Sequence, residues 1–167
     1  YRLIEKGYTV TLVDNFQRGA DDGDLRELRD TGGASFLRRD LLLTPAAGSF
    51  SADYDLIFHL AAVIGVRHVL RDPSRVLSNN QTLLENALAI ARDQNSLKRF
   101  VFASTSEVYS GTLKKYGLKF PTPEDTVLSL HNLGDARGSY MLSKIYGEAM
   151  CLNSDLPVTI IRPHNFY

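Results

Sequence analysis

Residues 99–107 read RFVFASTSE, an apolar run that ends in hydroxyl groups and a carboxylate. A short run of aromatic and β-branched residues is typical of a buried strand. Ser104, Thr105, Ser106 and Glu107 therefore come directly after a predicted strand. Because ligands of parallel α/β sheets bind at the carboxyl ends of the strands, this stretch predicts the edge of a functional site.

Strand-like and helical patterns alternate on both sides of this stretch. Strands are expected at residues 9–13, 34–37, 55–59, 99–103 and 158–161, and helices at residues 25–29, 76–92 and 140–152. The opening residues YRLIEKG indicate the last turns of a helix that ends at Gly7, so we expect the chain to begin inside an element. The alternation predicts an α/β fold, a doubly wound, Rossmann-like parallel sheet with helices on both faces.

The composition is that of an ordinary globular domain, with 167 residues of which 44% are hydrophobic. A formal net charge of zero gives no electrostatic argument for nucleic acid or for an anionic membrane. No apolar run approaches the roughly 20 residues of a membrane span, and the opening residues lack the charged-then-apolar pattern of a signal peptide. The single cysteine, Cys151, excludes an internal disulfide and a multi-cysteine metal site. We expect Cys151 to pack in the core of a cytoplasmic protein without a metal.

Tyr140 and Lys144 lie four residues apart in the predicted helix and so share one face of it. A phenol with a pKa of about 10 is a poor base at neutral pH. Since a neighbouring ammonium favours the phenolate, we expect Lys144 to lower the pKa of Tyr140. Thr105 is expected to hydrogen-bond the same substrate hydroxyl. The spacing alone is a weak signal in a chain with eight tyrosines, so its context carries the interpretation.

Polar or small residues follow the other predicted strands as well, at Asp14-Asn15, Asp40-Leu41, His59-Leu60-Ala61-Ala62 and Arg162 to Asn165. In a dinucleotide-binding fold, an acidic residue at the end of the second strand binds the adenosine ribose. It lies about 20 residues after the glycine-rich phosphate loop. Counting back from Asp14 places that loop before residue 1. Taken by itself, Asp14 also fits a turn residue at a strand end.

Seven short motifs occur in one order along the whole chain: Val13-Asp14-Asn15, Asp40-Leu41, His59-Leu60-Ala61-Ala62, Asn80 with Asn86, Ser104-Thr105-Ser106-Glu107-Val108-Tyr109, Tyr140-x-x-x-Lys144 and Arg162-Pro163-x-Asn165-x-Tyr167. In this the chain resembles the extended short-chain dehydrogenase/reductases that modify nucleotide sugars, such as UDP-galactose 4-epimerase, nucleotide-sugar 4,6-dehydratases and UDP-glucuronate decarboxylase. The resemblance implies NAD as cofactor and a nucleotide sugar as substrate.

Roles follow from the resemblance position by position. At the cofactor it implies Asp14 and Asn15 on the adenosine ribose, Asp40 and Leu41 beside the adenine, Leu60, Ala61 and Ala62 along the pyrophosphate and ribose, Asn80 bracing that wall, Ser104 at the strand end, and Lys144 on the nicotinamide ribose. Thr105, Tyr140 and Lys144 match the catalytic triad, in which the tyrosine removes the proton of the sugar hydroxyl. His164 matches a residue beside the nicotinamide and Asn165 one that contacts substrate phosphate, with a plain loop role open for both.

The sequence also departs from the family pattern. The glycine-rich loop and the C-terminal substrate domain are absent from the printed sequence, so we expect residues 1–167 to be an incomplete dinucleotide-binding domain, truncated at both ends. Ser110 stands where the family usually has a glycine after the Val108-Tyr109 pair. The stretch 111–138 is longer than in familiar relatives and is interpreted as a loop at the substrate entrance. Arg18 could meet a 2′-phosphate, but Asp14 would repel one, which favours NAD over NADP.

Ser106 and Glu107 bear on the reaction. A carboxylate beside the sugar exceeds what a plain 4-epimerase needs, and it can serve as general acid or base in a dehydratase or a decarboxylase. Glu107 could instead cap the following segment or pair with a surface cation. The hypothesis is an NAD-dependent epimerase or dehydratase that transiently oxidises the sugar at C4. UDP-glucuronate decarboxylation and a non-catalytic dinucleotide sensor are the alternatives, and a homodimer is expected from the resemblance.

Overall fold

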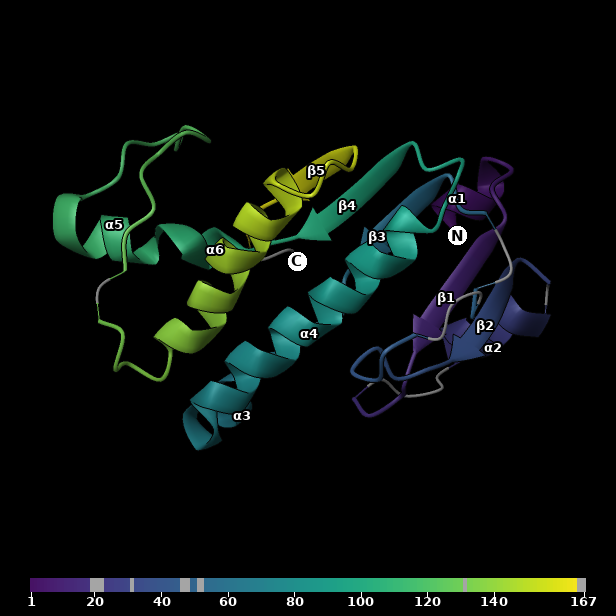
Figure 1. Cartoon of the computed structure of the whole chain (residues 1–167), viewed down its shortest axis with the longest axis horizontal. Coiled ribbons are helices and arrows are strands. Elements are labelled where there is room, and N and C mark those ends of the chain that lie inside the picture. The colour runs from purple at the N-terminus through teal and green to yellow at the C-terminus, as the bar shows by residue number, and fades with distance from the viewer. Residues whose placement is uncertain (19–22, 31, 46–48, 51–52, 131, 165–167) are drawn as a thin grey trace. The chain divides into compact units, whose positions relative to one another are not determined.

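The computed structural model describes residues 1–18, 23–30, 32–45, 49–50, 53–130 and 132–164. The chain forms two compact units, Tyr1–Leu43 and Thr44–Tyr167, and each unit has its own sheet (Figure 1). All strand pairs are parallel, which confirms the predicted α/β fold. Within the described residues the hydrogen-bonded strands form a two-stranded sheet in the first unit and a three-stranded sheet in the second.

The first unit contains α1 (Arg2–Glu5), β1 (Val10–Asp14), α2 (Gly23–Asp30) and β2 (Ala34–Arg38). β1 and β2 pair in parallel, with Val10 opposite Ala34 and Asp14 opposite Arg38. Gly7 follows α1 with a φ of +82°, a left-handed conformation that glycine adopts at little cost. The helix end predicted at Gly7 is thereby confirmed.

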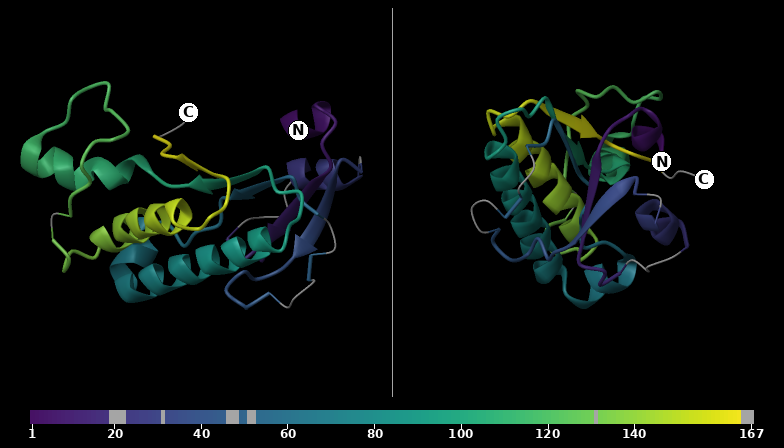
Figure 2. Two further views of the ribbon diagram at one scale, coloured as in Figure 1. Left: turned by 45° about the horizontal axis from the view of Figure 1, so that its top comes forward. Right: turned by 90° about the vertical axis from the view of Figure 1, so that its right-hand side faces the viewer.

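The second unit is built on three parallel strands in the order β3 (Leu56–His59), β4 (Arg99–Ala103) and β5 (Val158–Ile161). Two helices, α4 (Pro73–Arg92) and α6 (Gly138–Leu152), lie side by side along one face of this sheet (Figures 1 and 2). Because the strands are parallel, their carboxyl ends meet at one edge of the sheet. That edge carries the candidate site.

The core of the second unit lies between the sheet and the two helices. Phe100 and Phe102, two residues apart on β4, both belong to this core and are at most 2% exposed. Cys151 packs in the same cluster, as the sequence predicts. A glycine allows α6 to come this close, because a Cβ added at Gly147 would lie 2.6 Å from the ring of Phe102. The helix that carries Tyr140 and Lys144 is therefore seated directly on the central strand.

Three helices near the site were not expected from the sequence: α3 (Val66–Arg71), the short 3₁₀ helix η1 (Ser106–Tyr109) and α5 (Ser110–Tyr116). α5 occupies the start of the stretch that the sequence analysis interpreted as a loop. Its glycine is required by packing, because a Cβ at Gly111 would lie 1.7 Å from the carbonyl oxygen of Ser129. Thr112 adds to this contact through its hydroxyl oxygen, which accepts a hydrogen bond from the Ser129 nitrogen (3.1 Å).

The packing at Gly111 leads to a stability prediction. We expect Gly111→Ala to lower the free energy of unfolding by about 1–3 kcal/mol, because the added methyl group must displace the backbone at Ser129. Urea unfolding of the full-length protein measures the change. The matched control is Gly23→Ala, where an added Cβ meets nothing within 4 Å and alanine has the higher helix propensity. Equal stability of the two variants would contradict the packing argument.

Candidate active site

The carboxyl ends of β3, β4 and β5 are followed by Leu60, Ser104 and Arg162, and α6 runs past them with Tyr140 and Lys144. Lys144 is only 4% exposed, and its Nζ donates to the carbonyl oxygen of Ala103 at 2.6 Å. The same nitrogen lies 4.9 Å from the centroid of the Phe102 ring. Burial lowers the pKa of Lys144 to about 8. The ammonium is thus held at the end of β4 by a carbonyl and an aromatic face.

Tyr140 lies on the same helix face, with Lys144 Nζ 5.8 Å from its ring centroid. The pKa of Tyr140 is raised from its ordinary value, first by burial and second by the negative charge of Glu107, while a hydrogen bond with Thr105 acts in the opposite direction. The expected lowering by Lys144 is not found. Two physical reasons account for the raised pKa of Tyr140: the phenolate loses water at this half-buried position, and the nearby Glu107 carboxylate repels it.

Thr105 has two contacts that fix its hydroxyl. Its Oγ1 accepts a hydrogen bond from the Glu107 nitrogen at 3.2 Å and so caps η1, while the same side chain hydrogen-bonds Tyr140. Thr105, and not Glu107, is therefore the capping residue. Glu107 is exposed and forms no ion pair with another described residue. Ser106 is half-buried, and its nitrogen donates to Pro163 O at 3.0 Å.

An ion pair with a buried carboxylate joins the elements around Tyr140 and Lys144. Arg162 Nε and Nη2 donate to the two carboxylate oxygens of Glu148 at 2.9 and 2.6 Å, and Glu148 is 4% exposed. Ser104 Oγ donates to the same carboxylate, and Arg162 Nη1 donates to the hydroxyl of Tyr109. A bidentate arginine–carboxylate pair has a fixed planar geometry. The ends of β4 and β5, the 3₁₀ helix and α6 are therefore linked through one carboxylate.

The side chain of Asn80 forms three hydrogen bonds, two of them with the backbone of Val63 in the segment after β3. Its Oδ1 accepts from the nitrogen of Val63 at 2.6 Å, and its Nδ2 donates to Val63 O at 3.2 Å and to Ser143 Oγ at 3.1 Å. The contact is with Val63, the residue after Leu60, Ala61 and Ala62. The loop is thereby tied to both α4 and α6, while its role in cofactor binding stays a prediction.

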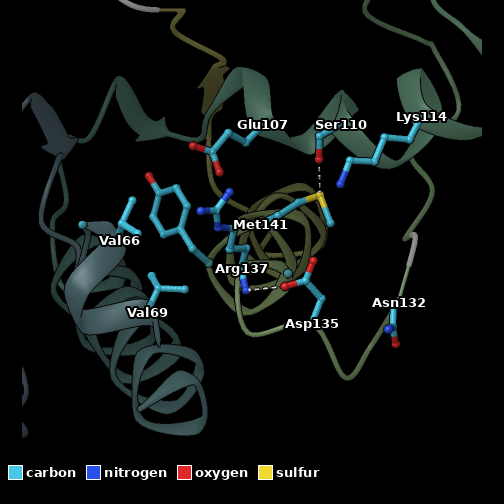
Figure 3. A pocket seen from close by; sticks show the side chains of 12 residues that line it. Val66, Val69, Glu107, Ser110, Lys114, Asn132, Asp135, Arg137 and Met141 are labelled. Atoms are coloured by element: carbon cyan, nitrogen blue, oxygen red, sulfur yellow. Dashed lines mark hydrogen bonds between the residues drawn. The ribbon is translucent and has the colours of Figure 1, made fainter. Parts of the chain in front are cut away.

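A pocket of about 410 Å³ lies beside Tyr140 (Figure 3). Its charged lining residues are Glu107, Lys114, Asp135 and Arg137, and its apolar lining includes Val66, Val69 and Met141. Figure 3 shows the Arg137 side chain reaching toward Glu107, with Lys114 on the far side of Met141. A pocket of this size, with a few convergent polar groups beside a reactive side chain, is typical of a small-molecule site.

The other predicted cofactor residues do not line this pocket. Asp14, Asn15, Arg18, Asp40 and Leu41 belong to the first unit. Asp14 Oδ1 accepts from Phe16 N at 2.7 Å, and Asp40 Oδ1 accepts from Leu42 N at 2.9 Å, so each carboxylate closes a turn after its strand. In the second unit, His164 is exposed, and Asn165 lies outside the described residues.

Several residues of the site were missed by reasoning from sequence. Glu148 lies one helical turn after Lys144, a spacing that could have placed it on the same face. Arg137 and Asp135 come just before Tyr140, but they were included in the long loop. In contrast, His59 is not an acid–base candidate, because burial and the charge of Lys144 lower its pKa to about 3 and keep it neutral. Within the described residues, no cluster could hold a metal ion, and no helix is long and apolar enough to cross a membrane.

Comparison with known proteins gives consistent matches over the whole chain. A family model described as the NAD dependent epimerase/dehydratase family matches residues 1–167. The UDP-N-acetyl-alpha-D-glucosaminuronate decarboxylase of Bacillus cytotoxicus is 32% identical over 169 residues, which cover 99% of this chain and 49% of that protein. The chain spans about half the length of the curated relatives it matches.

Solved structures are similar in fold over nearly all of the chain. The crystal structure of a UDP-galactose 4-epimerase has a TM-score of 0.72 at 28% identity, with 96% of this chain and 49% of that chain covered. The UDP-glucuronic acid 4-epimerase from Bacillus cereus in complex with NAD has a TM-score of 0.67 at 26% identity, with 96% and 51% covered.

The electrostatics of Tyr140 can be tested directly. Glu107→Gln removes the neighbouring negative charge and keeps the side-chain size, so we expect the pKa of Tyr140 to fall toward 10. Ultraviolet titration of the phenolate in the full-length protein, with Tyr140→Phe as the reference for the other tyrosines, measures the shift. Asp135→Asn is the matched control, because Asp135 lines the pocket but is not among the causes of the Tyr140 shift. An unchanged pKa in E107Q would mean that Glu107 has no electrostatic effect on Tyr140.

The Arg162–Glu148 pair leads to a second prediction. Arg162→Met leaves the Glu148 carboxylate buried without its cation, and we expect the free energy of unfolding to fall by about 3–5 kcal/mol. The double variant Arg162→Met/Glu148→Met should recover most of this loss, because no charge stays buried. Lys98→Met is the control. It breaks an exposed 2.7 Å pair with Asp55, which is worth about 1 kcal/mol or less. If denaturant unfolding gives R162M and K98M the same loss of unfolding free energy, the argument is refuted.

Proposed function

Since the chain belongs to the NAD dependent epimerase/dehydratase family, we propose that the full-length protein oxidises a nucleotide sugar transiently at C4. The observation that carries the proposal is the meeting of Tyr140 and Glu107 in one pocket, with Thr105 hydrogen-bonded to Tyr140 and Lys144 buried on the same helix. These groups provide a proton acceptor, a hydroxyl that orients it, a cation and a second carboxylate. Proton transfer at an alcohol-bearing carbon needs such a set.

In this proposal Tyr140 first loses its phenolic proton to solvent, a step that burial and Glu107 oppose, and the phenolate then accepts the proton of the C4 hydroxyl. Thr105 hydrogen-bonds Tyr140 and orients its oxygen, and the Thr105 hydroxyl is itself held by the backbone of Glu107. Lys144 has two N–H groups beyond the one that Ala103 accepts, and its lowered pKa of about 8 lets it gain or lose a proton near neutrality. Bound NAD would supply the acceptor and later the donor of the C4 hydride, so the whole cycle would have no net redox change.

The residues present fit the chemistry of NAD. Asp14 is exposed after β1 and uses Oδ1 in its own turn, so its other carboxylate oxygen is an acceptor suited to ribose hydroxyls. Its negative charge disfavours the additional phosphate of NADP near Arg18. Asn15, Asp40, Leu41, Ser104 and His164 are proposed as further contacts, together with the wall Leu60, Ala61 and Ala62 that Asn80 braces through Val63.

Glu107 bears on the type of reaction. A plain 4-epimerase needs no carboxylate beyond the triad, whereas a dehydratase removes a proton next to the new ketone and a decarboxylase adds one after loss of carbon dioxide. Glu107 lines the pocket and has no described ion-pair partner, which favours such a role. The relative in Bacillus cytotoxicus is a decarboxylase of a sugar uronate. Decarboxylation is therefore the second candidate.

A dinucleotide sensor without catalysis is the alternative from another class. It needs the cofactor wall but has no use for a tyrosine that shares a hydrogen bond with Thr105. A homodimer and a cytoplasmic location are further proposals. Tyr146 and Leu152 on α6 are 47% and 72% exposed, which supports a contact through this helix, and the single cysteine suits a reducing compartment. Asn165 is proposed to contact substrate phosphate.

Tyr140→Phe in the full-length protein tests the proposal. We expect turnover to fall roughly 10²- to 10⁴-fold, because the proton acceptor is lost, while NAD affinity changes little. Mass spectrometry of products from UDP-, dTDP- and GDP-sugars, including UDP-glucuronate, measures turnover. Loss of water or of carbon dioxide gives Glu107 a chemical role, and an unchanged mass with altered retention indicates epimerisation.

Tyr146→Phe is the matched control, since this tyrosine lies on the same helix and is not in the pocket. Unchanged biological activity of Y140F, together with no change of any sugar by the wild-type protein, would support the sensor and exclude the enzyme.

A further inference from the structure

Two cationic side chains line the pocket beside Tyr140. Arg137 and Lys114 come from different elements, the start of α6 and α5, and Figure 3 shows both side chains on the wall of the same pocket. Neither cation forms an ion pair with any residue that the structure describes. Glu107 and Asp135 also line this pocket, so an anionic ligand group would bind at the two cations, which lack an ion-pair partner among the described residues.

The backbone of Arg137 is fixed more firmly than that of an ordinary surface arginine. Its nitrogen donates to Asp135 Oδ1 at 3.0 Å, and the next residue, Gly138, donates to Asp135 O at 2.8 Å. Arg137 precedes Tyr140 by three residues at the helix start, so both side chains project from the same side of α6. The backbone of Arg137 is thereby held one helical turn from that of Tyr140.

The side chain of Arg137 has no hydrogen bond to another described residue, although it reaches toward Glu107 in Figure 3. A guanidinium carries five N–H donors in a planar fork, and one edge of the fork can hold a carboxylate in a bidentate pair. An arginine between Glu107 and a bound anion could offer one edge to each. It would then reduce the repulsion between the two negative groups.

A nucleotide sugar has two kinds of anion that could lie here, its diphosphate and a carboxylate at C6. The proposed chemistry places C4 at Tyr140. C6 is attached to C5, the direct neighbour of C4, whereas the diphosphate is attached to C1 across the ring. A group three residues from Tyr140 on the same helix is therefore better placed for the carboxylate.

On these grounds, and resting on the proposed function, we infer that Arg137 is a specificity-determining residue that binds the C6 carboxylate of a sugar uronate. Lys114 supplies a second positive charge on the same pocket wall. The substrate class is then a nucleotide sugar acid, not a neutral hexose. The arginine that recognises the acid lies within this chain, in the stretch that the sequence analysis assigned to the substrate entrance.

Isothermal titration of the full-length, NAD-loaded protein tests the inference with three probes: UDP-glucuronate, UDP-glucose and UDP. Wild type should bind UDP-glucuronate more tightly than UDP-glucose. Arg137→Gln should weaken the binding of UDP-glucuronate by roughly 10- to 100-fold and change UDP-glucose and UDP less than about twofold, because only the first probe has the carboxylate. Arg137→Lys keeps the charge but not the fork, so its loss should be intermediate.

Arg92→Gln is the matched control, with the same change of charge at an exposed position that does not line the pocket. An equal loss for all three probes in R137Q would assign the arginine to the diphosphate and overturn the inference. So would an unchanged affinity for UDP-glucuronate, or a wild type that prefers UDP-glucose. These outcomes are separate from failure of the proposed function, which is the absence of turnover of every nucleotide sugar in the product assay.

Discussion

The Glu148 carboxylate is the point on which the geometry of the site depends. It accepts hydrogen bonds from Nε and Nη2 of Arg162 and from the hydroxyl of Ser104, and Glu148 is only 4% exposed. Because the carboxylate is buried, loss of any one partner would leave a charge or a hydrogen-bond donor that water cannot reach. The pair therefore fixes the axial position of α6 against the ends of β4 and β5. Tyr140 and Lys144, on the same helix, take their places at the strand ends from that constraint.

Features set by short-range sequence could be predicted. The strands Arg99–Ala103 and Val158–Ile161 agree with the expected limits, because a short apolar run bounded by polar residues is typical of a buried strand in a parallel sheet. α4 begins three residues before the expected start, at Pro73, because the side chain of Asp72 caps it and proline suits the first turn. The four-residue spacing of Tyr140 and Lys144 placed both on one helix face, as expected.

Features set by contacts between distant segments could not be predicted. α5 starts with serine and glycine, which have low helix propensity, and it depends on Gly111 and Thr112 packing against the backbone near Ser129. The pairing of Glu148 with Arg162 likewise requires the positions of β5 and α6 in space. The direction of the Tyr140 pKa shift was predicted wrongly for the same reason. It depends on burial and on a carboxylate that lies 33 positions earlier in the sequence.

The raised pKa of Tyr140 and the cations of the pocket belong to one electrostatic balance. Burial and Glu107 both oppose formation of the phenolate, so a second anion from the substrate would oppose it further. A guanidinium at Arg137 would compensate for that charge by binding the substrate carboxylate. In the proposal made above, the carboxylate of the sugar and the guanidinium of Arg137 would therefore balance each other beside Tyr140.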